Sequence, residues 1–88
     1  MQVEFLASFN KDVNKLSVVS VRQSLKKLIL RVESSKSLSD IPNLKKLSGH
    51  PTAYRIRLGD FRVGFFYENN IVQFARIVHR KDIYKVFP

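Results

Sequence analysis

Six side chains in the second half of the chain are of the types that bind and cleave phosphodiesters. They are four arginines, one histidine and one tyrosine: Arg55, Arg57, Arg62, His79, Arg80 and Tyr84. Arginine binds phosphate oxygens through paired hydrogen bonds and can stabilise the charge of a pentacoordinate transition state. Histidine can exchange a proton near neutral pH, and tyrosine can stack on a base or transfer a proton. Because RNA carries its own nucleophile, the 2′-hydroxyl, this set favours metal-independent cleavage of RNA over DNA.

Each of these residues also has a purely structural interpretation. Arginines on an open sheet face usually contact solvent, and a cluster of three is more often a binding surface than a catalytic one. His79 can cap the end of a strand, and Tyr84 can hold the C-terminal segment by packing. His50 is interpreted as a loop residue without a role. On these residues alone, the chain is a basic nucleic-acid-binding protein with a candidate ribonuclease site.

The charge of the chain favours a polyanionic partner. Sixteen Lys and Arg against seven Asp and Glu give a formal net charge of +9 on 88 residues. Such a field attracts nucleic acid first, an acidic protein second and an anionic membrane third. The absence of cysteine excludes disulfides, thiolate metal sites and cysteine nucleophiles. Apolar runs are shorter than the ~20 residues that span a bilayer, and the N-terminus lacks the features of a secretion signal, so we expect a cytoplasmic protein.

Apolar periodicity in the N-terminal part predicts one strand and two helices. Residues 2–6 alternate as a strand does. Apolar residues at i, i+4 and i+7 from Phe9 predict a short helix, for which Ser8 is the expected N-cap. A second helical stripe predicts a helix over about 18–34 with Ser17 as its N-cap. The two helices are expected to form a hairpin with one continuous apolar side.

The stretch between this hairpin and the later strands is expected to be a loop. Residues 34–40 are rich in serine, Pro42 disfavours a helix just before it, and 49–51 form a turn signal. Four apolar residues are expected to hold this connection against the core: Leu38, Ile41, Leu44 and Leu47.

Three strands follow, and the Gly59-Asp60 turn determines how the first two pair. A two-residue loop, of type II′ because glycine comes first, places Arg57 opposite Arg62 and Arg55 opposite Gly64. The three arginines then share one face with a glycine that leaves space above the sheet. The other face is expected to be apolar: Tyr54, Ile56, Leu58, Phe61, Val63 and Phe65.

The turn at residues 69–70 leaves two registers open for the last strand. A two-residue loop places Ile77 and His79 on the arginine face, whereas a three-residue loop places Arg76 there instead of His79. We favour the two-residue loop, because it keeps Phe74 in the core.

The order of elements predicts an α+β fold. It consists of an N-terminal strand, a helical hairpin and a three-stranded antiparallel meander. Together the strands are expected to form a four-stranded sheet with both helices on one face. Residues 80–84 are expected to form a turn or short helix over the end of the sheet. Neither an internal repeat nor a linker interrupts residues 1–88, so a single domain is expected.

Three segments carry a combined motif. They are the KLSG sequence at 46–49, the YRIRLGDFRV run at 54–63 and the HRKDIY run at 79–84. With the length, charge and element order, this combination resembles the RelE/ParE superfamily of type II toxin–antitoxin toxins, and the RelE-like branch in particular. The resemblance covers the whole chain and implies a single RelE-like toxin domain over 1–88.

The resemblance implies a function and a set of site residues. RelE-like toxins are endoribonucleases (mRNA interferases) that cut mRNA in the ribosomal A site, inhibit translation and are held by a cognate antitoxin. We expect no metal and no small-molecule cofactor. The implied catalytic residues are Arg62, Arg80, Tyr84 and His79, and the implied RNA-binding residues are Arg55, Arg57, Lys46 and Lys81. The best-known members carry lysine at the positions of Arg55 and Arg57. Because arginine is a poor base, proton transfer is expected of His79 or Tyr84.

Two other functions stay open at this stage. The ParE-like branch inhibits DNA gyrase and needs no nuclease site, and a non-catalytic basic RNA-binding module is the third alternative. The HRxxxY pattern at 79–84 favours the ribonuclease. The net charge and the apolar residues Phe9, Val13 and Leu16 of the first helix would suit an acidic or amphipathic antitoxin segment.

Overall fold

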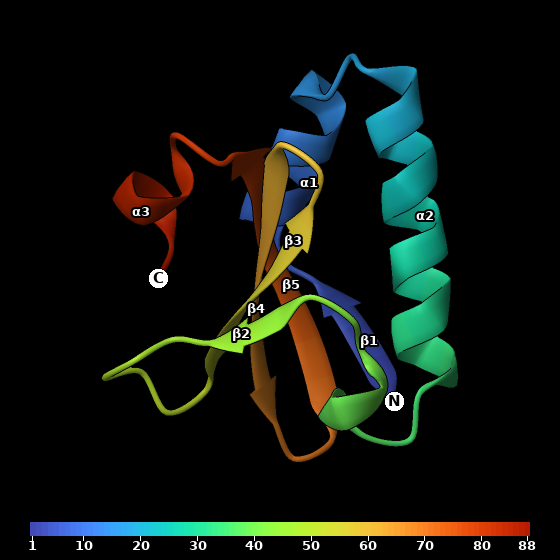
Figure 1. Ribbon diagram of the computed structural model, residues 1–88, viewed down its shortest axis with the longest axis vertical. Coiled ribbons are helices and arrows are strands. Elements are labelled where there is room, and N and C mark those ends of the chain that lie inside the picture. Colours follow the sequence, from blue (N-terminus) through green and yellow to red (C-terminus); the bar gives the residue numbers. More distant parts are fainter.

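A central sheet separates two helices on one side from a short C-terminal helix on the other (Figure 1). The computed structural model describes all of residues 1–88. Its elements are β1 (Gln2–Phe5), α1 (Ala7–Lys15), α2 (Val19–Ser34), a 3₁₀ turn (Leu38–Asp40), β2 (Leu44–Lys46), β3 (Ala53–Leu58), β4 (Phe61–Glu68), β5 (Ile71–His79) and α3 (Ile83–Val86). None of the helices is long and apolar enough to cross a membrane. The α+β class predicted from the sequence is confirmed.

The sheet has five strands in the order β1-β5-β4-β3-β2, and not the four that were expected. The additional strand is β2, which pairs antiparallel with β3 over only three residues. A strand this short carries almost no alternation, and Pro42 directly before Asn43 suggested an irregular connection. Asn43 has a φ of 60°, so the chain turns sharply there and enters the sheet edge.

The main core lies between the sheet and the helix pair α1–α2. Leu25, Leu28 and Val32 of α2 recur with helical spacing and are all buried, as the sequence pattern predicted. Against them pack Phe9 of α1 and Phe74 of β5, whose ring centres are 5.4 Å apart. The predicted apolar face of β3 and β4 is confirmed, since all six of its residues are buried in this core or packed against it.

The turn between β4 and β5 has the predicted two-residue loop. Asn69 and Asn70 have φ values of 54° and 62°, the sign that a type I′ turn requires at both positions. Phe65 therefore pairs with Phe74, and both rings are fully buried.

A β-bulge then changes the face of the sheet to which the later side chains of β5 point. Gly64 pairs with Arg76 rather than with Ala75, so Ala75 is an extra residue in the strand. Beyond it, Ile77 packs into the main core, and His79 lies on the helix side of the sheet. The predicted places of Ile77 and His79 on the arginine face are therefore wrong, because strict alternation holds only without a bulge.

Helix α1 covers the edge of β5 that β1 leaves open. β1 pairs in parallel with β5 over residues 71–74 only. Beyond that point the Ser8 hydroxyl donates to the carbonyl oxygen of Ala75 at 2.6 Å, and the Asp12 carboxylate accepts from the backbone N–H of Ile77 at 3.0 Å. Side chains of α1 thus take the place of a neighbouring strand and protect the edge.

Neither serine predicted as a helix cap has that role. The N-cap positions are Leu6 for α1 and Val18 for α2, and neither helix has a side-chain cap. The Ser8 hydroxyl instead bonds to β5 and holds α1 against it, and Ser17 lies one residue before the cap position of α2. The apolar stripes, and not capping side chains, position these two helices.

Asp12 is the buried acid that ties α1 to the sheet. Its side chain is 7% exposed and receives hydrogen bonds from Arg76 at 2.7 and 3.1 Å, besides the one from Ile77. The hydrogen bond and the charge of Asp12 together raise the pKa of Arg76, although partial burial acts in the opposite direction. The pair therefore joins α1 to β5 through both charge and hydrogen bonds.

Replacement of Asp12 with alanine is expected to lower the free energy of unfolding by about 2–3 kcal/mol, since it leaves Arg76 and the N–H of Ile77 without their acceptor. Urea unfolding followed by circular dichroism measures this. Glu33→Ala is the matched control, because it removes the same charge from an exposed position of α2, and it should change stability by less than about 0.5 kcal/mol. Equal losses in the two variants would contradict the edge-protecting role.

Candidate functional site

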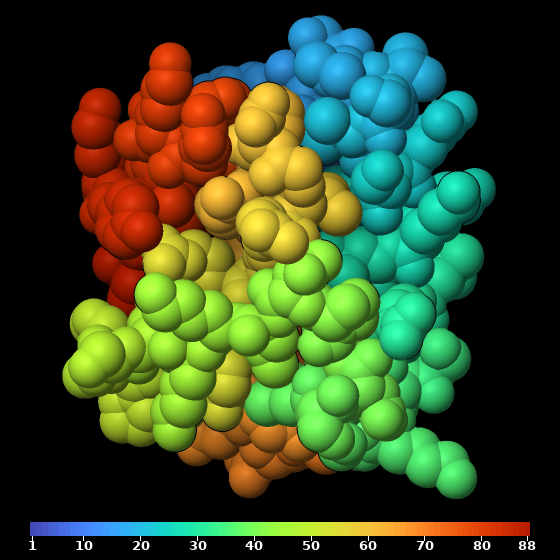
Figure 2. All heavy atoms as spheres, viewed as in Figure 1, coloured from blue at the N-terminus to red at the C-terminus, as the bar shows by residue number.

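Three arginines line a shallow pocket of about 380 Å³ on the sheet side that faces away from α1 and α2. Its lining comes from β2, β3, β4 and α3, and these segments meet at the surface in Figure 2 as green, yellow and red spheres. The lining residues are Asn43, Leu44, Lys45, Arg55, Arg57, Arg62 and Tyr84. We call this the arginine pocket. No acidic residue lines it, so its charge is entirely positive.

Strand pairing brings the arginines together. Arg57 pairs with Arg62 and Arg55 with Gly64, as the Gly59-Asp60 turn predicted. The turn itself has a positive φ of 60° at Gly59, which suits a type II′ loop and favours glycine. Alternate residues of a strand point to opposite faces, so these side chains lie on one side while the apolar residues between them lie in the core.

Arg55 is buried without an acidic partner. It is 8% exposed, and its guanidinium carbon lies 4.6 Å from the centre of the Tyr84 ring. The ion pairs of the structure involve Arg76, Arg80 and Lys85, and none reaches Arg55. A cation–π contact contributes about 0.5–2 kcal/mol but does not neutralise the charge. The Arg55 side chain lines the pocket, so a phosphate there can bind it directly.

Arg57 and Arg62 are held by neutral acceptors. One terminal nitrogen of Arg57 donates to Asn43 Oδ1 at 3.3 Å. One terminal nitrogen of Arg62 donates to the carbonyl oxygens of Gly59 and Phe61 at 2.8 and 2.9 Å. A guanidinium has five N–H donors, so both arginines keep donors free for phosphate oxygens.

Helix α3 places Tyr84 in the pocket lining, and the buried side chain of Phe87 holds this helix against the sheet. Tyr84 is 77% exposed, whereas Ile83 and Phe87 are buried in a second, smaller core that includes Ala75. A Cβ atom at Gly64 would lie 2.5 Å from the Phe87 ring, closer than such atoms approach. The space expected above Gly64 is therefore filled by Phe87, and only glycine permits that contact.

The structure does not bring His79 into the arginine pocket. It pairs with Phe61, whose ring centre is 5.7 Å from its own, and lines a hollow near the start of α2. Its Nδ1 accepts a hydrogen bond from the backbone N–H of Lys81 at 3.2 Å. The bulge at Ala75 causes this placement, since it reverses the side of every later residue in β5. The sequence-based assignment of proton transfer to His79 therefore does not fit its position.

The other predicted site residues lie outside the pocket lining. The Nε atom of Arg80 is 4.0 Å from the carboxylate of Asp60, at the β3–β4 turn. Lys46 pairs with Tyr54 and so belongs to the opposite side of β2 from the pocket, near the 47–51 loop. Lys81 is exposed in the turn after β5.

Two pocket residues escaped the sequence analysis, Asn43 and Lys45. Lys45 pairs with Arg55 and so lies on the arginine side, whereas the sequence analysis had named its neighbour Lys46 as RNA-binding. Asn43 accepts a hydrogen bond from the Arg57 backbone N–H at 3.2 Å and joins β2 to β3. The sequence does contain a signal for both residues. The Pro-Asn pair at 42–43 indicates a turn, and the apolar Leu44 followed by the basic Lys45 is typical of a strand at a sheet edge.

This arrangement suits a phosphodiester. Three guanidinium groups and one ammonium group surround the pocket and can bind phosphate oxygens and the charge that develops on them. An exposed tyrosine ring beside them can stack on an unpaired base. Nowhere in the chain do three or more His, Asp or Glu side chains gather as metal ligands would.

Comparison with known proteins finds relatives among toxins. No family model matches the chain. Toxin RelE3 from Methanocaldococcus jannaschii is 36% identical over 89 residues, which cover all of both chains. A RelB–RelE antitoxin–toxin complex from Methanococcus jannaschii has a chain with a TM-score of 0.82 and 34% identity, over 97% of this chain and 99% of that one. The intact RelBE toxin–antitoxin complex from E. coli gives a TM-score of 0.69 at 26% identity, over 89% and 94%.

Gly64→Ala is expected to push Phe87 and α3 off the sheet and to lower stability by about 1–3 kcal/mol through overpacking. Amide hydrogen exchange over residues 83–87 measures the release of α3. The double variant Gly64→Ala/Phe87→Leu is the control, because the smaller side chain makes room for the methyl group and should restore part of the protection. Unchanged exchange in Gly64→Ala would mean that Phe87 does not depend on the glycine.

Proposed function

The chain belongs to the RelE family of toxins, and we propose from this that it is the toxin of a toxin–antitoxin pair that inhibits translation by cutting mRNA on the ribosome. Two of the similar structures are toxins bound to their antitoxins, which supports a cognate antitoxin as the protein partner of this chain. The cleavage would need no metal ion, since the substrate supplies the nucleophile and the pocket supplies the positive charge.

The observation that carries the ribonuclease proposal is that Arg55, Arg57 and Arg62 line one pocket and that none of them has an acidic partner. A phosphodiester gains negative charge on its non-bridging oxygens as the attacking oxygen adds to phosphorus. Fixed cations in a partly dehydrated pocket stabilise that extra charge more than they stabilise the ground state.

In the proposed reaction, the 2′-hydroxyl oxygen attacks the adjacent phosphorus and the 5′-oxygen of the next nucleotide leaves. The products are a 2′,3′-cyclic phosphate and a 5′-hydroxyl, so one proton leaves the 2′-hydroxyl and one joins the leaving oxygen. Lys45 and Tyr84 are the lining residues that can exchange a proton, because arginine does not deprotonate. We assign proton transfer to these two and charge stabilisation to Arg55, Arg57 and Arg62.

Three further cations are proposed to contact the RNA backbone outside the pocket: Arg80, Lys46 and Lys81. Arg80 is 59% exposed on its side chain and its pairing with Asp60 is weak at 4.0 Å, so it can swing toward a bound strand. Contacts of this kind strengthen binding in a salt-dependent way and carry little sequence information.

Arg55→Ala and Arg62→Ala are each expected to lower mRNA cleavage about 10²–10³-fold, because each removes a cation from the transition state. Induction of the protein in cells, followed by mapping of mRNA 5′ ends, measures the cuts. Arg31→Ala, which removes the same charge from an exposed position of α2, should cleave as the unmodified chain does. Intact mRNA together with stalled gyrase complexes would instead identify a gyrase inhibitor. Absence of growth arrest with salt-sensitive RNA binding would identify a non-catalytic binding module.

Lys45→Arg and Tyr84→Phe test proton transfer separately from charge and stacking. Arginine keeps the positive charge of Lys45 without its ability to deprotonate, and phenylalanine keeps the ring over Arg55 without the hydroxyl. Each variant is expected to bind mRNA normally and to cleave it at least about 10²-fold more slowly. If both variants cleave mRNA at the rate of the unmodified chain, the proton is transferred by groups outside this chain.

A further inference from the structure

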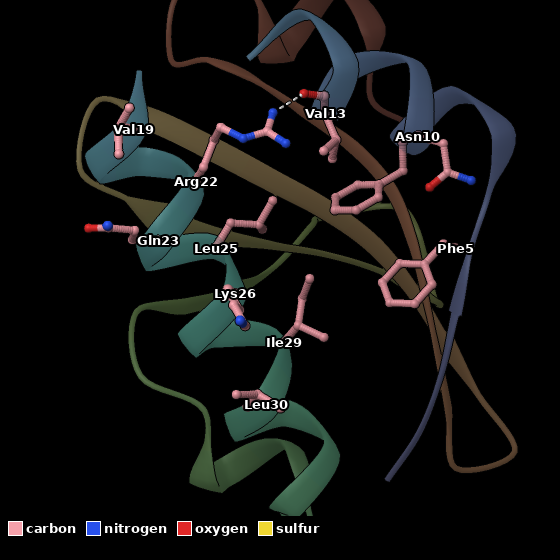
Figure 3. Close-up of a pocket in the computed structure, with 11 residues that line it drawn as sticks. Phe5, Asn10, Val13, Val19, Arg22, Gln23, Leu25, Lys26, Ile29 and Leu30 are labelled. Carbon is pink, nitrogen blue, oxygen red and sulfur yellow. Dashed lines mark hydrogen bonds between the residues drawn. The ribbon is translucent and has the colours of Figure 1, made fainter. Parts of the chain in front are cut away.

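A nucleotide whose phosphate is bound by the three arginines cannot reach the largest concavity of the chain. That concavity is an apolar groove of about 650 Å³ between α1, α2 and the end of β1 (Figure 3). In Figure 3 the side chains of Phe5, Val13, Ile29 and Leu30 lie around it. The groove is on the opposite side of the sheet from the arginine pocket. A group of this chain that distinguishes one base from another beside the bound phosphate therefore belongs to the arginine pocket.

Asn43 is the one neutral amide in the pocket lining. It directly precedes β2, and its backbone carbonyl oxygen accepts from the N–H of Arg57 at 3.2 Å, so it lies beside Arg57 at the edge of the sheet. Arg57 in turn pairs with Arg62. The three residues form one row across the sheet, in which neighbouring strands are about 5 Å apart. A phosphate held by the two arginines thus has an amide one strand away from it.

Arg57 determines which way the side chain of Asn43 points. A terminal nitrogen of Arg57 lies 3.3 Å from Oδ1 of Asn43. A guanidinium can only donate, so the oxygen of the amide has to face it, and the nitrogen faces away. Nδ2 of Asn43 carries two N–H donors, and no hydrogen bond within the chain uses them. Asn43 is exposed, so these donors are accessible to a ligand in the pocket.

The rest of the lining offers few acceptors. Lys45 and the three arginines carry only donors, and Leu44 has no polar side-chain atom. The Asn43 oxygen already accepts from Arg57, which leaves the hydroxyl of Tyr84 as the other side-chain acceptor. A base that presents an exocyclic oxygen therefore finds a donor beside the arginines. A base that presents an amino group at the same position loses that hydrogen bond.

We propose that Asn43 is a specificity-determining residue that donates from Nδ2 to the exocyclic oxygen of a guanine or uracil base. Guanine O6 and uracil O4 are acceptors, whereas adenine and cytosine carry an amino group at the corresponding position. The proposal rests on the proposed function, because it takes the ligand of the pocket to be single-stranded RNA. The arginines bind phosphate whatever the base, so affinity and base selection have separate sources in one pocket.

The test measures the Kd of 2′-O-methyl octauridylate and octacytidylate, which lack the nucleophile for cleavage, at one fixed salt concentration. The unmodified chain is expected to bind the uridylate about fivefold more tightly, the net worth of one hydrogen bond. Asn43→Asp is expected to reverse this ratio. Aspartate has the same shape, tolerates the φ of 60°, keeps an oxygen facing Arg57 and replaces the two donors with an acceptor. Asn43→Gly removes the amide and should bring the ratio close to one.

The ratio of the two Kd values separates base selection from charge, because the negative charge of Asn43→Asp weakens the binding of both oligonucleotides alike. Asn14→Asp is the matched control, since it makes the same change at an exposed position of α1 and should leave the ratio unchanged. The same ratio in the unmodified chain and in Asn43→Asp would overturn the proposal. So would failure of the unmodified chain to bind either oligonucleotide.

Mapping of mRNA 5′ ends in cells distinguishes this proposal from the ribonuclease itself. If mRNA is cut and the bases beside the cuts are the same for the unmodified chain and Asn43→Asp, base selection by Asn43 fails and the ribonuclease stands. If Asn43→Asp reverses the ratio of the Kd values while mRNA stays intact, base selection stands and the ribonuclease fails.

Discussion

Burial of one face of the β3–β4 pair holds like charges together on the other face. Ile56, Val63 and Phe65 are at most 1% exposed, and each contributes roughly 1.5–3 kcal/mol on burial. Repulsion between like charges at the surface, such as the exposed Arg57 and the half-buried Arg62, is typically under about 1 kcal/mol per pair. The free energy gained by burying the apolar face therefore exceeds the repulsion between the arginines. The cations keep their positions without any acid to neutralise them. A phosphate can then bind to a charge cluster whose cost the core has already offset.

Alternation along β3 and β4 was enough to predict the pairing of Arg57 with Arg62, because a two-residue turn leaves few registers. The same rule was wrong beyond Phe74 in β5. There the bulge at Ala75 accommodates contacts from distant segments: the Ser8 hydroxyl on its carbonyl oxygen, and α1 along its edge. A single-sequence pattern does not contain such contacts, so the position of His79 could not be predicted. Strand β2 was missed for a similar reason, since three residues gain their structure from the neighbour they pair with.

The two faces of the sheet carry surfaces of different chemistry. The arginine pocket is small, cationic and open to a phosphodiester, while the groove between α1 and α2 is larger and apolar. The ion pair of Asp12 with Arg76 joins α1, which walls the groove, to β5, the strand next to β4 of the pocket.

The pocket depends on α3 for its tyrosine, and this helix has only four residues. A helix so short is not stable by itself in water, so its position comes from the burial of Ile83 and Phe87. Two buried side chains supply about 3–6 kcal/mol, whereas whole domains have about 5–15 kcal/mol. The end of the chain can therefore open and close as a local unit while the sheet stays folded. Because Tyr84 reaches the pocket only through α3, release of this helix would remove the ring from beside Arg55 while the paired strands keep the three arginines in place.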